Sequence, residues 1–244
     1  MAYSTHTMGF GLQSHAIGNR PEWELVDRTE RNLWQEIAAA TGGVVAPGMM
    51  LTAAGFGLSV DMNRRVLREY RQTSQLSGKT LLCATVALLG EGVLDLLDGS
   101  VATATGTRSP LGRRADTGSD VCRIGLTAYT LTRCKVVPLY AAGMLAGQKI
   151  LTAAPSLIAN ARGNEPAVSS WGKVTAAQQR LCLGAYLLSA TCEQLGVEIV
   201  DDPTKAAHYG KAAETLYKLA TAALVTSSAT SIPAALTYAR AAKS

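Results

Sequence analysis

The stretch Asp95-Leu-Leu-Asp98-Gly99-Ser-Val-Ala102-Thr103 decides the reading of this chain, because it sets two carboxylates into an otherwise apolar segment. The chain continues to Gly112-Arg-Arg-Ala-Asp116-Thr-Gly-Ser-Asp120, which carries two more. The first two carboxylates are three residues apart and the second two are four apart, so each pair would lie on one face of its own helix. Residues 103–110 are rich in Gly, Thr, Ser and Pro and predict a loop between the two helices.

Four carboxylates on two neighbouring helices predict a site for a hard divalent cation. Oxygen ligands of this kind suit Mg²⁺ or Mn²⁺. Ionised groups inside an apolar segment are costly and are usually kept for function, which favours a site over a run of surface aspartates at helix ends. The apolar neighbours of the first pair are Leu94, Leu96, Leu97 and Val101.

The spacing of these residues resembles the hallmark pattern of the CDP-alcohol phosphatidyltransferase family. That pattern, D-x2-D-G-x2-A-x9-G-x3-D-x3-D, is spelled here by Asp95, Asp98, Gly99, Ala102, Gly112, Asp116 and Asp120. Seven defined positions at fixed offsets make a specific signal. One family position differs, because Thr103 stands where the family has Arg.

Two further segments carry weaker resemblances to the same family. Thr52 matches the Thr of the family's first membrane helix, while the Pro-Asn pair that commonly precedes it reads Gly48-Met49. The segment 161–178 is similar to the loop and fifth-helix start of phosphatidylglycerophosphate synthases, with a second Lys missing and a spacing one residue shorter. Its matching residues are Ser170, Trp171, Gly172, Lys173, Thr175 and Gln178. Cardiolipin synthases have a similar Lys-x-x-Thr stretch.

The resemblance implies roles for individual residues. Asp95, Asp98 and Asp116 would hold Mg²⁺ or Mn²⁺, and Asp120 would be the catalytic base and also touch metal. The small residues Gly99, Ala102 and Gly112, with Thr52, would adjoin the CDP moiety. An acceptor phosphate would be bound by cations from the set Arg108, Arg113, Arg114, Arg123 and Lys173, of which Arg123 lies one turn from Asp120. Glu91 also lies one turn before Asp95 and is expected to support the site or to pair with a basic group.

The implied reaction is transfer of a phosphatidyl group from a CDP-alcohol, such as CDP-diacylglycerol, to an acceptor alcohol with release of CMP. Glycerol 3-phosphate is the favoured acceptor, and phosphatidylglycerol or an inositol phosphate is the alternative. Thr103 and the missing Asn leave open a catalytically weakened member that serves as a structural membrane subunit of a larger complex. A polyprenyl transferase is less supported, because those sites use N/D-x-x-x-D spacings. The family resemblance also suggests a homodimer.

The amino-acid composition limits the fold and function classes that fit this chain. The 244 residues are 48% hydrophobic but only 5% aromatic and 17% charged, as in helices that pack through small side chains. The net charge of +5 suits anionic lipid headgroups or phosphorylated substrates, and no basic-aromatic motif indicates nucleic acid. The five cysteines lack C-x-x-C spacing and the three histidines are scattered, so neither a zinc site nor a histidine-based triad is expected.

The apolar pattern predicts an all-α integral membrane bundle of six transmembrane helices. The expected spans are 42–60, 80–102, 115–134, 136–158, 175–195 and 212–239, each close to the roughly 20 residues that cross a bilayer. The basic connector 61–79 is expected to extend the first helix into solvent, and Pro233 to interrupt the last. The mean hydropathy of +0.13 is low for such a bundle.

An N-terminal amphipathic helix over residues 21–40, with Trp23 and Trp34, is expected to lie at the membrane interface. The expected organisation is therefore a tail with this helix over residues 1–42 and a membrane domain over residues 43–244. The expected location is a bacterial cytoplasmic membrane or the mitochondrial inner membrane.

Overall fold

The computed structural model describes residues 35–37, 39–41, 46–107, 110–162, 169–200 and 202–243, and all regular structure among them is α-helical. The main helices are α2 (Pro47–Thr73), α3 (Gly78–Ala104), α4 (Pro110–Arg133), α5 (Leu139–Ala161), α6 (Ser170–Glu198) and α7 (Pro203–Lys243). The all-α prediction is confirmed. Most of the predicted helix at 21–40 lies outside the described residues.

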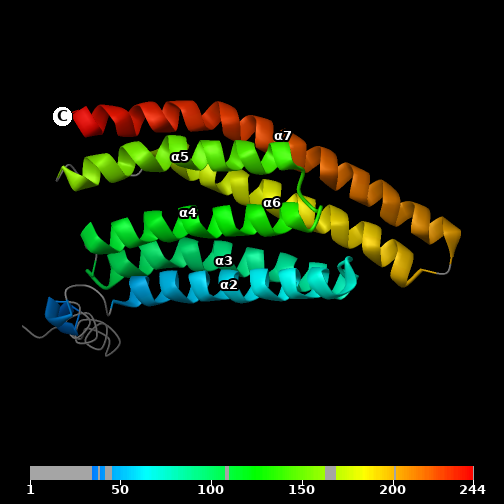
Figure 1. Cartoon of the computed structure of the whole chain (residues 1–244). Helices are drawn as coiled ribbons and strands as arrows, with labels where there is room; N and C mark the ends of the chain where they lie inside the picture. Colours follow the sequence, from blue (N-terminus) through cyan, green and yellow to red (C-terminus); the bar gives the residue numbers. More distant parts are fainter. Residues whose placement is uncertain are drawn as a thin grey trace, which may run out of the picture.

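The six helices lie side by side and run alternately in opposite directions (Figure 1). Helix α2 packs on α3 and α4, α3 packs on α6, and α4 packs on α5, while α7 contacts both α5 and α6. Because directions alternate, the end of α3 and the starts of α4 and α6 come to the same end of the bundle, together with the C-terminus. The segments 95–103 and 112–120, which carry the four aspartates, thus meet in space.

Within the described residues, α3 and α7 are the two helices long and apolar enough to cross a membrane. Helix α3 turns a row of large apolar side chains outward, with Leu82, Val86, Leu89 and Val93 exposed. Helix α2, by contrast, carries the exposed arginines Arg64, Arg65 and Arg68. The prediction of six transmembrane helices is therefore not confirmed.

Two helix boundaries bear on the sequence predictions. Helix α2 continues to Thr73, so the first part of the basic connector is a helical extension, as expected. Helix α7 continues through Pro233, and the predicted interruption there was wrong. The proline leaves the carbonyl of Ala229 without its helical hydrogen bond, but extensive packing of α7 on α5 and α6 favours the continuous helix.

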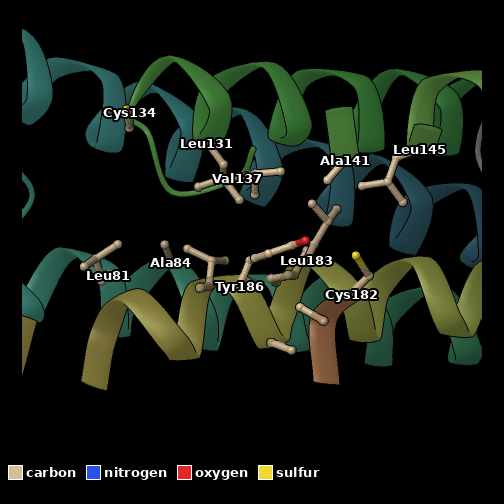
Figure 2. Packing of buried hydrophobic residues seen from close by; sticks show 14 of the residues in the cluster. Leu81, Ala84, Leu131, Cys134, Val137, Ala141, Leu145, Cys182, Leu183 and Tyr186 are labelled. Carbon is tan, nitrogen blue, oxygen red and sulfur yellow. The ribbon is translucent and has the colours of Figure 1, made fainter. Parts of the chain in front are cut away.

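The apolar core occupies the part of the bundle away from the motif. It joins all the main helices through fully buried side chains that include Leu131, Val137, Leu183 and Tyr186 (Figure 2). Along α3 the core residues Leu81, Ala84 and Leu88 come first and the carboxylates follow. The carboxylates therefore lie directly beyond a packed apolar floor.

Helices α2 and α3 approach closely at Gly48. A Cβ atom at this position would lie 2.9 Å from both the Ala102 Cβ and the Asp98 carbonyl oxygen. Because helix backbones cannot yield easily, only glycine allows this contact. The contact brings Thr52, one turn further along α2, beside Asp98.

We predict that Gly48→Ala and Gly57→Ala change stability in opposite directions. The first substitution forces α2 away from α3 and is expected to cost about 1–3 kcal/mol. A Cβ at Gly57 meets nothing within 4 Å, so alanine there should gain up to about 1 kcal/mol of helix propensity. Thermal unfolding of the purified protein measures both, and an equal loss in the two variants would contradict the close contact at Gly48.

Candidate active site

Three of the four motif carboxylates form one group. Asp95 and Asp98 of α3 and Asp116 of α4 each offer an oxygen, and these oxygens lie within 4.8 Å of one another. The Oδ1 atom of Asp116 is buried and has no hydrogen-bond partner among the described residues. A buried oxygen without a partner is costly unless something else satisfies it. Three carboxylate oxygens at this separation fit a hard divalent cation.

Thr52 orients one member of this group. Its hydroxyl donates to the Oδ2 atom of Asp98 over 2.8 Å, and both residues are buried. Thr52 thus leaves the other oxygen of Asp98 for the group. Gly48 makes the contact possible, so the glycine in the altered Pro-Asn pair has a structural role here.

The small residues predicted to adjoin the CDP moiety lie at the end of α3 and the start of α4. Gly99 is exposed, and a Cβ there would meet nothing within 4 Å, so protein packing does not require glycine at this position. Ala102 contacts Gly48, and Gly112 is half-buried near the start of α4. Space beside Gly99 is consistent with a ligand approaching there. Its role in CDP binding stays a prediction.

Asp120 lies outside the three-carboxylate group and is surrounded by cations instead. It accepts from Arg180 Nη2 of α6 over 2.9 Å, from Lys149 of α5, and more weakly from Arg123 Nη2 over 3.4 Å. Its side chain is about one-fifth exposed. Three helices therefore converge on this carboxylate through ion pairs.

Asp95 joins the carboxylate group to the cations. Its Oδ1 accepts from Arg123 Nη2 over 2.8 Å and its Oδ2 pairs with Arg180 Nη2 over 2.6 Å. Gly55 of α2 makes room for this arrangement, since a Cβ there would lie 2.9 Å from Arg123 Nη1. Arg123 is 3% exposed, so its charge depends on these partners.

The charges of the site do not balance within the protein. Five carboxylates (Asp95, Asp98, Asp116, Asp120 and the buried Glu91) lie with three cations (Arg123, Lys149 and Arg180). Two negative charges remain if all are ionised. Because buried charges are stable only when compensated, one divalent cation would bring this set to neutrality.

Lys149 and Arg180 were not singled out from the sequence. Each directly follows a buried glutamine, and Gln179 Nε2 donates to Gln148 Oε1 over 3.0 Å. Gln148 Oε1 also accepts from Ser227 Oγ of α7 over 2.9 Å. This bond network sets the register of α5, α6 and α7 and so places both cations. The signal that could have found them is a basic residue within an apolar helix.

The remaining acceptor-phosphate candidates are less central. Arg108 and the side chain of Arg113 lie outside the described residues, while Arg114 and Lys173 are exposed near the starts of α4 and α6. Arg123 is the described candidate that lies between Asp95 and Asp120.

The segment 161–178, which resembles phosphatidylglycerophosphate synthases in sequence, links α6 to α7 through its described residues. The Ser169 hydroxyl caps α6 by accepting from Gly172 N over 2.9 Å. Thr175 donates to Thr230 of α7 over 2.9 Å, and Thr230 donates to Gln178 over 2.7 Å. Thr175 and Gln178 therefore act in helix packing.

We predict that Mn²⁺ raises the unfolding temperature through the carboxylate group. Ligand at about 100 times its dissociation constant adds roughly 2.7 kcal/mol of stability. Asp98→Asn should remove most of this gain. Asp61→Asn, at an exposed carboxylate that pairs with Arg65, is the control and should keep it. An undiminished Mn²⁺ effect in the Asp98 variant would exclude this group as the metal site.

Comparison with known proteins gives the family. The chain matches the family model "CDP-alcohol phosphatidyltransferase" over residues 49–239. No curated protein and no solved structure gave a match. The matched range contains Thr52, every carboxylate of the site and all three cations, and it covers most of the chain. This protein therefore belongs to the CDP-alcohol phosphatidyltransferase family.

Proposed function

We propose that this protein transfers a phosphatidyl group from CDP-diacylglycerol to glycerol 3-phosphate and releases CMP, with Mg²⁺ or Mn²⁺ bound by Asp95, Asp98 and Asp116. The family consists of transferases of phospholipid biosynthesis that use a CDP-alcohol and an alcohol acceptor. The main support within this chain is the grouping of three carboxylates beside Asp120, at the motif positions.

The reaction makes and breaks one bond at the β-phosphorus of the CDP-alcohol. The acceptor hydroxyl oxygen bonds to this phosphorus, the bond to the bridging oxygen breaks, and CMP leaves with the bonding electrons. Asp95, Asp98 and Asp116 would hold the divalent ion, which would supply positive charge to offset the charge growing on CMP. Asp120 takes the proton of the attacking hydroxyl.

The cations around Asp120 support a phosphorylated acceptor. Arg123, Lys149 and Arg180 bring many donors to one carboxylate, and guanidinium groups bind phosphate oxygens in pairs. An acceptor phosphate that draws donors away from Asp120 would leave this carboxylate available to the hydroxyl. Phosphatidylglycerol and inositol phosphate also carry phosphate, so an acceptor panel must separate the three.

The membrane setting is part of the proposal. Members of the family are membrane proteins, and α3 and α7 have the length and composition of spans. We propose that residues 43–244 form the membrane domain with all six main helices crossing, in a bacterial cytoplasmic membrane or the mitochondrial inner membrane. A homodimer, or membership of a larger membrane complex, completes this proposal.

We predict CMP release from labelled CDP-diacylglycerol when Mn²⁺ and glycerol 3-phosphate are present, and its loss in Asp120→Asn. Removing the proton acceptor should lower turnover by about 10²–10⁴-fold. Asp61→Asn serves as the exposed control with normal turnover. Undiminished turnover of the Asp120 variant would remove its role as base.

The same CMP-release assay distinguishes the enzyme from the alternative of a structural membrane subunit. Wild-type protein that releases no CMP with any of the three acceptors, yet purifies with a constant set of partner proteins, would favour that alternative over the enzyme.

We predict that Arg180→Lys raises the KM for glycerol 3-phosphate more than the KM for CDP-diacylglycerol. Lysine keeps the charge but loses the planar pair of donors, so we expect about a tenfold increase for the acceptor. Lys205→Gln, at an exposed position of α7, is the control. Equal changes in the two KM values would argue against an acceptor phosphate at Arg180.

A further inference from the structure

Glu91 is a buried carboxylate of α3 that the proposed reaction does not use. The residue is 4% exposed, and its Oε1 atom has no hydrogen-bond partner among the described residues. Arg123, which is 3% exposed, carries a buried Nε–H that also lacks a partner in this part of the chain. A buried acceptor and a buried donor thus both lack a hydrogen-bond partner, which is rare in native proteins.

Both groups line the same small cavity. The cavity lies where the apolar core meets the site, and its volume is about that of one water molecule. Its other walls are Leu88, Asp120, Ile124, Thr127, Arg180 and Leu183. A buried water typically makes about three hydrogen bonds to groups of this kind. The cavity therefore offers one water both a carboxylate acceptor and a guanidinium donor.

We propose that Glu91 is a positioning residue that holds Arg123 in place through a water molecule bound in this cavity. The water accepts from Arg123 Nε and donates to Glu91 Oε1. Glu91 touches neither substrate nor metal in this arrangement, and it acts through the arginine.

The water bridge would fix the orientation of the Arg123 guanidinium plane. One edge of this planar group is held by the bonds from Nη2 to Asp95 and Asp120. At Nη1 it faces Gly55, which has no side chain to contact it. A partner at Nε prevents rotation of the plane about the Nη2 contacts. Asp95 is thereby kept in the orientation that presents it to the carboxylate group.

The polar partner of Glu91 within the protein is the buried hydroxyl of Ser59 on α2, which can instead donate to a carbonyl one turn earlier in its own helix when the carboxylate is removed. Leu88, Ile124 and Leu183 already provide apolar walls, and a leucine at position 91 would suit them. Exchanging a buried, incompletely satisfied polar group for an apolar one of similar size is commonly neutral or stabilising. Stability and activity should therefore separate when Glu91 is replaced.

The test compares Glu91→Gln and Glu91→Leu, with Glu193→Gln at an exposed site of α6 as the control. Glutamine keeps an oxygen acceptor for the water and should retain at least about half of the turnover number. Leucine fills the cavity and should lower the turnover number about tenfold through misplacement of Arg123. The unfolding temperature of the leucine variant should not fall below that of the wild type.

Three results would overturn the proposal. They are wild-type turnover in the leucine variant, equal impairment of the glutamine and leucine variants, or a loss of activity in the leucine variant that follows a lowered unfolding temperature. The kinetic arm rests on the proposed function.

If the wild type releases no CMP, that function fails and a high-resolution density map decides the inference by itself. Density for a water within hydrogen-bond distance of Glu91 Oε1 and Arg123 Nε would support it. Direct bonding of these two atoms, or other partners for both, would exclude it.

Discussion

The site depends on one shared carboxylate, that of Asp95. This group offers an oxygen to the set formed with Asp98 and Asp116, and it also pairs with Arg123 and Arg180. Without the two guanidinium groups, the surplus of negative charge between α3 and α4 would force the helices apart or the carboxylates out of their ionised form. The ion pairs of Arg180 also hold α6 against α3 and α4, so the charges of the site contribute to the packing of the bundle.

Small residues make this arrangement sterically possible. Gly48 allows α2 and α3 to touch, which places Thr52 on Asp98, and Gly55 leaves space for Arg123. The apolar core begins immediately beyond Leu88 and Leu183. It gives the charged groups a rigid support of low polarity, where ion pairs are stronger than in water. A polar site of this density would be hard to hold on a more loosely packed scaffold.

The sequence was most informative where spacing along one helix decides the outcome. The offsets of the four aspartates predicted two pairs facing one another, because helix periodicity places each pair on one face. The structure groups Asp95, Asp98 and Asp116, whereas Asp120 lies among cations. Arg123 was predicted one turn from Asp120, but the other two partners of Asp120 could not be predicted in this way. Lys149 and Arg180 are 29 and 60 residues away along the chain, and their register depends on buried contacts of Gln148 and Gln179. Pro233 shows the opposite case, since α7 packs extensively on α5 and α6 and stays continuous where the residue type alone predicted an interruption.

Thr103 stands where the family pattern has arginine, and its surroundings show which contacts the substitution affects. The residue is exposed, and its hydroxyl donates to the Gly99 carbonyl of its own helix over 2.7 Å. None of the ion pairs in the described residues depends on it. The carboxylate group and its cations are thus built without the family arginine.

We propose that one divalent cation at Asp95, Asp98 and Asp116 balances the charges of the site. Counting the Mn²⁺ ions bound per chain in substrate-free protein, by electron paramagnetic resonance titration, tests it most directly. We expect one tightly bound ion per chain, and none when all three aspartates are replaced by asparagine. An absence of tight binding in the wild type, or unchanged binding in the triple variant, would contradict this account.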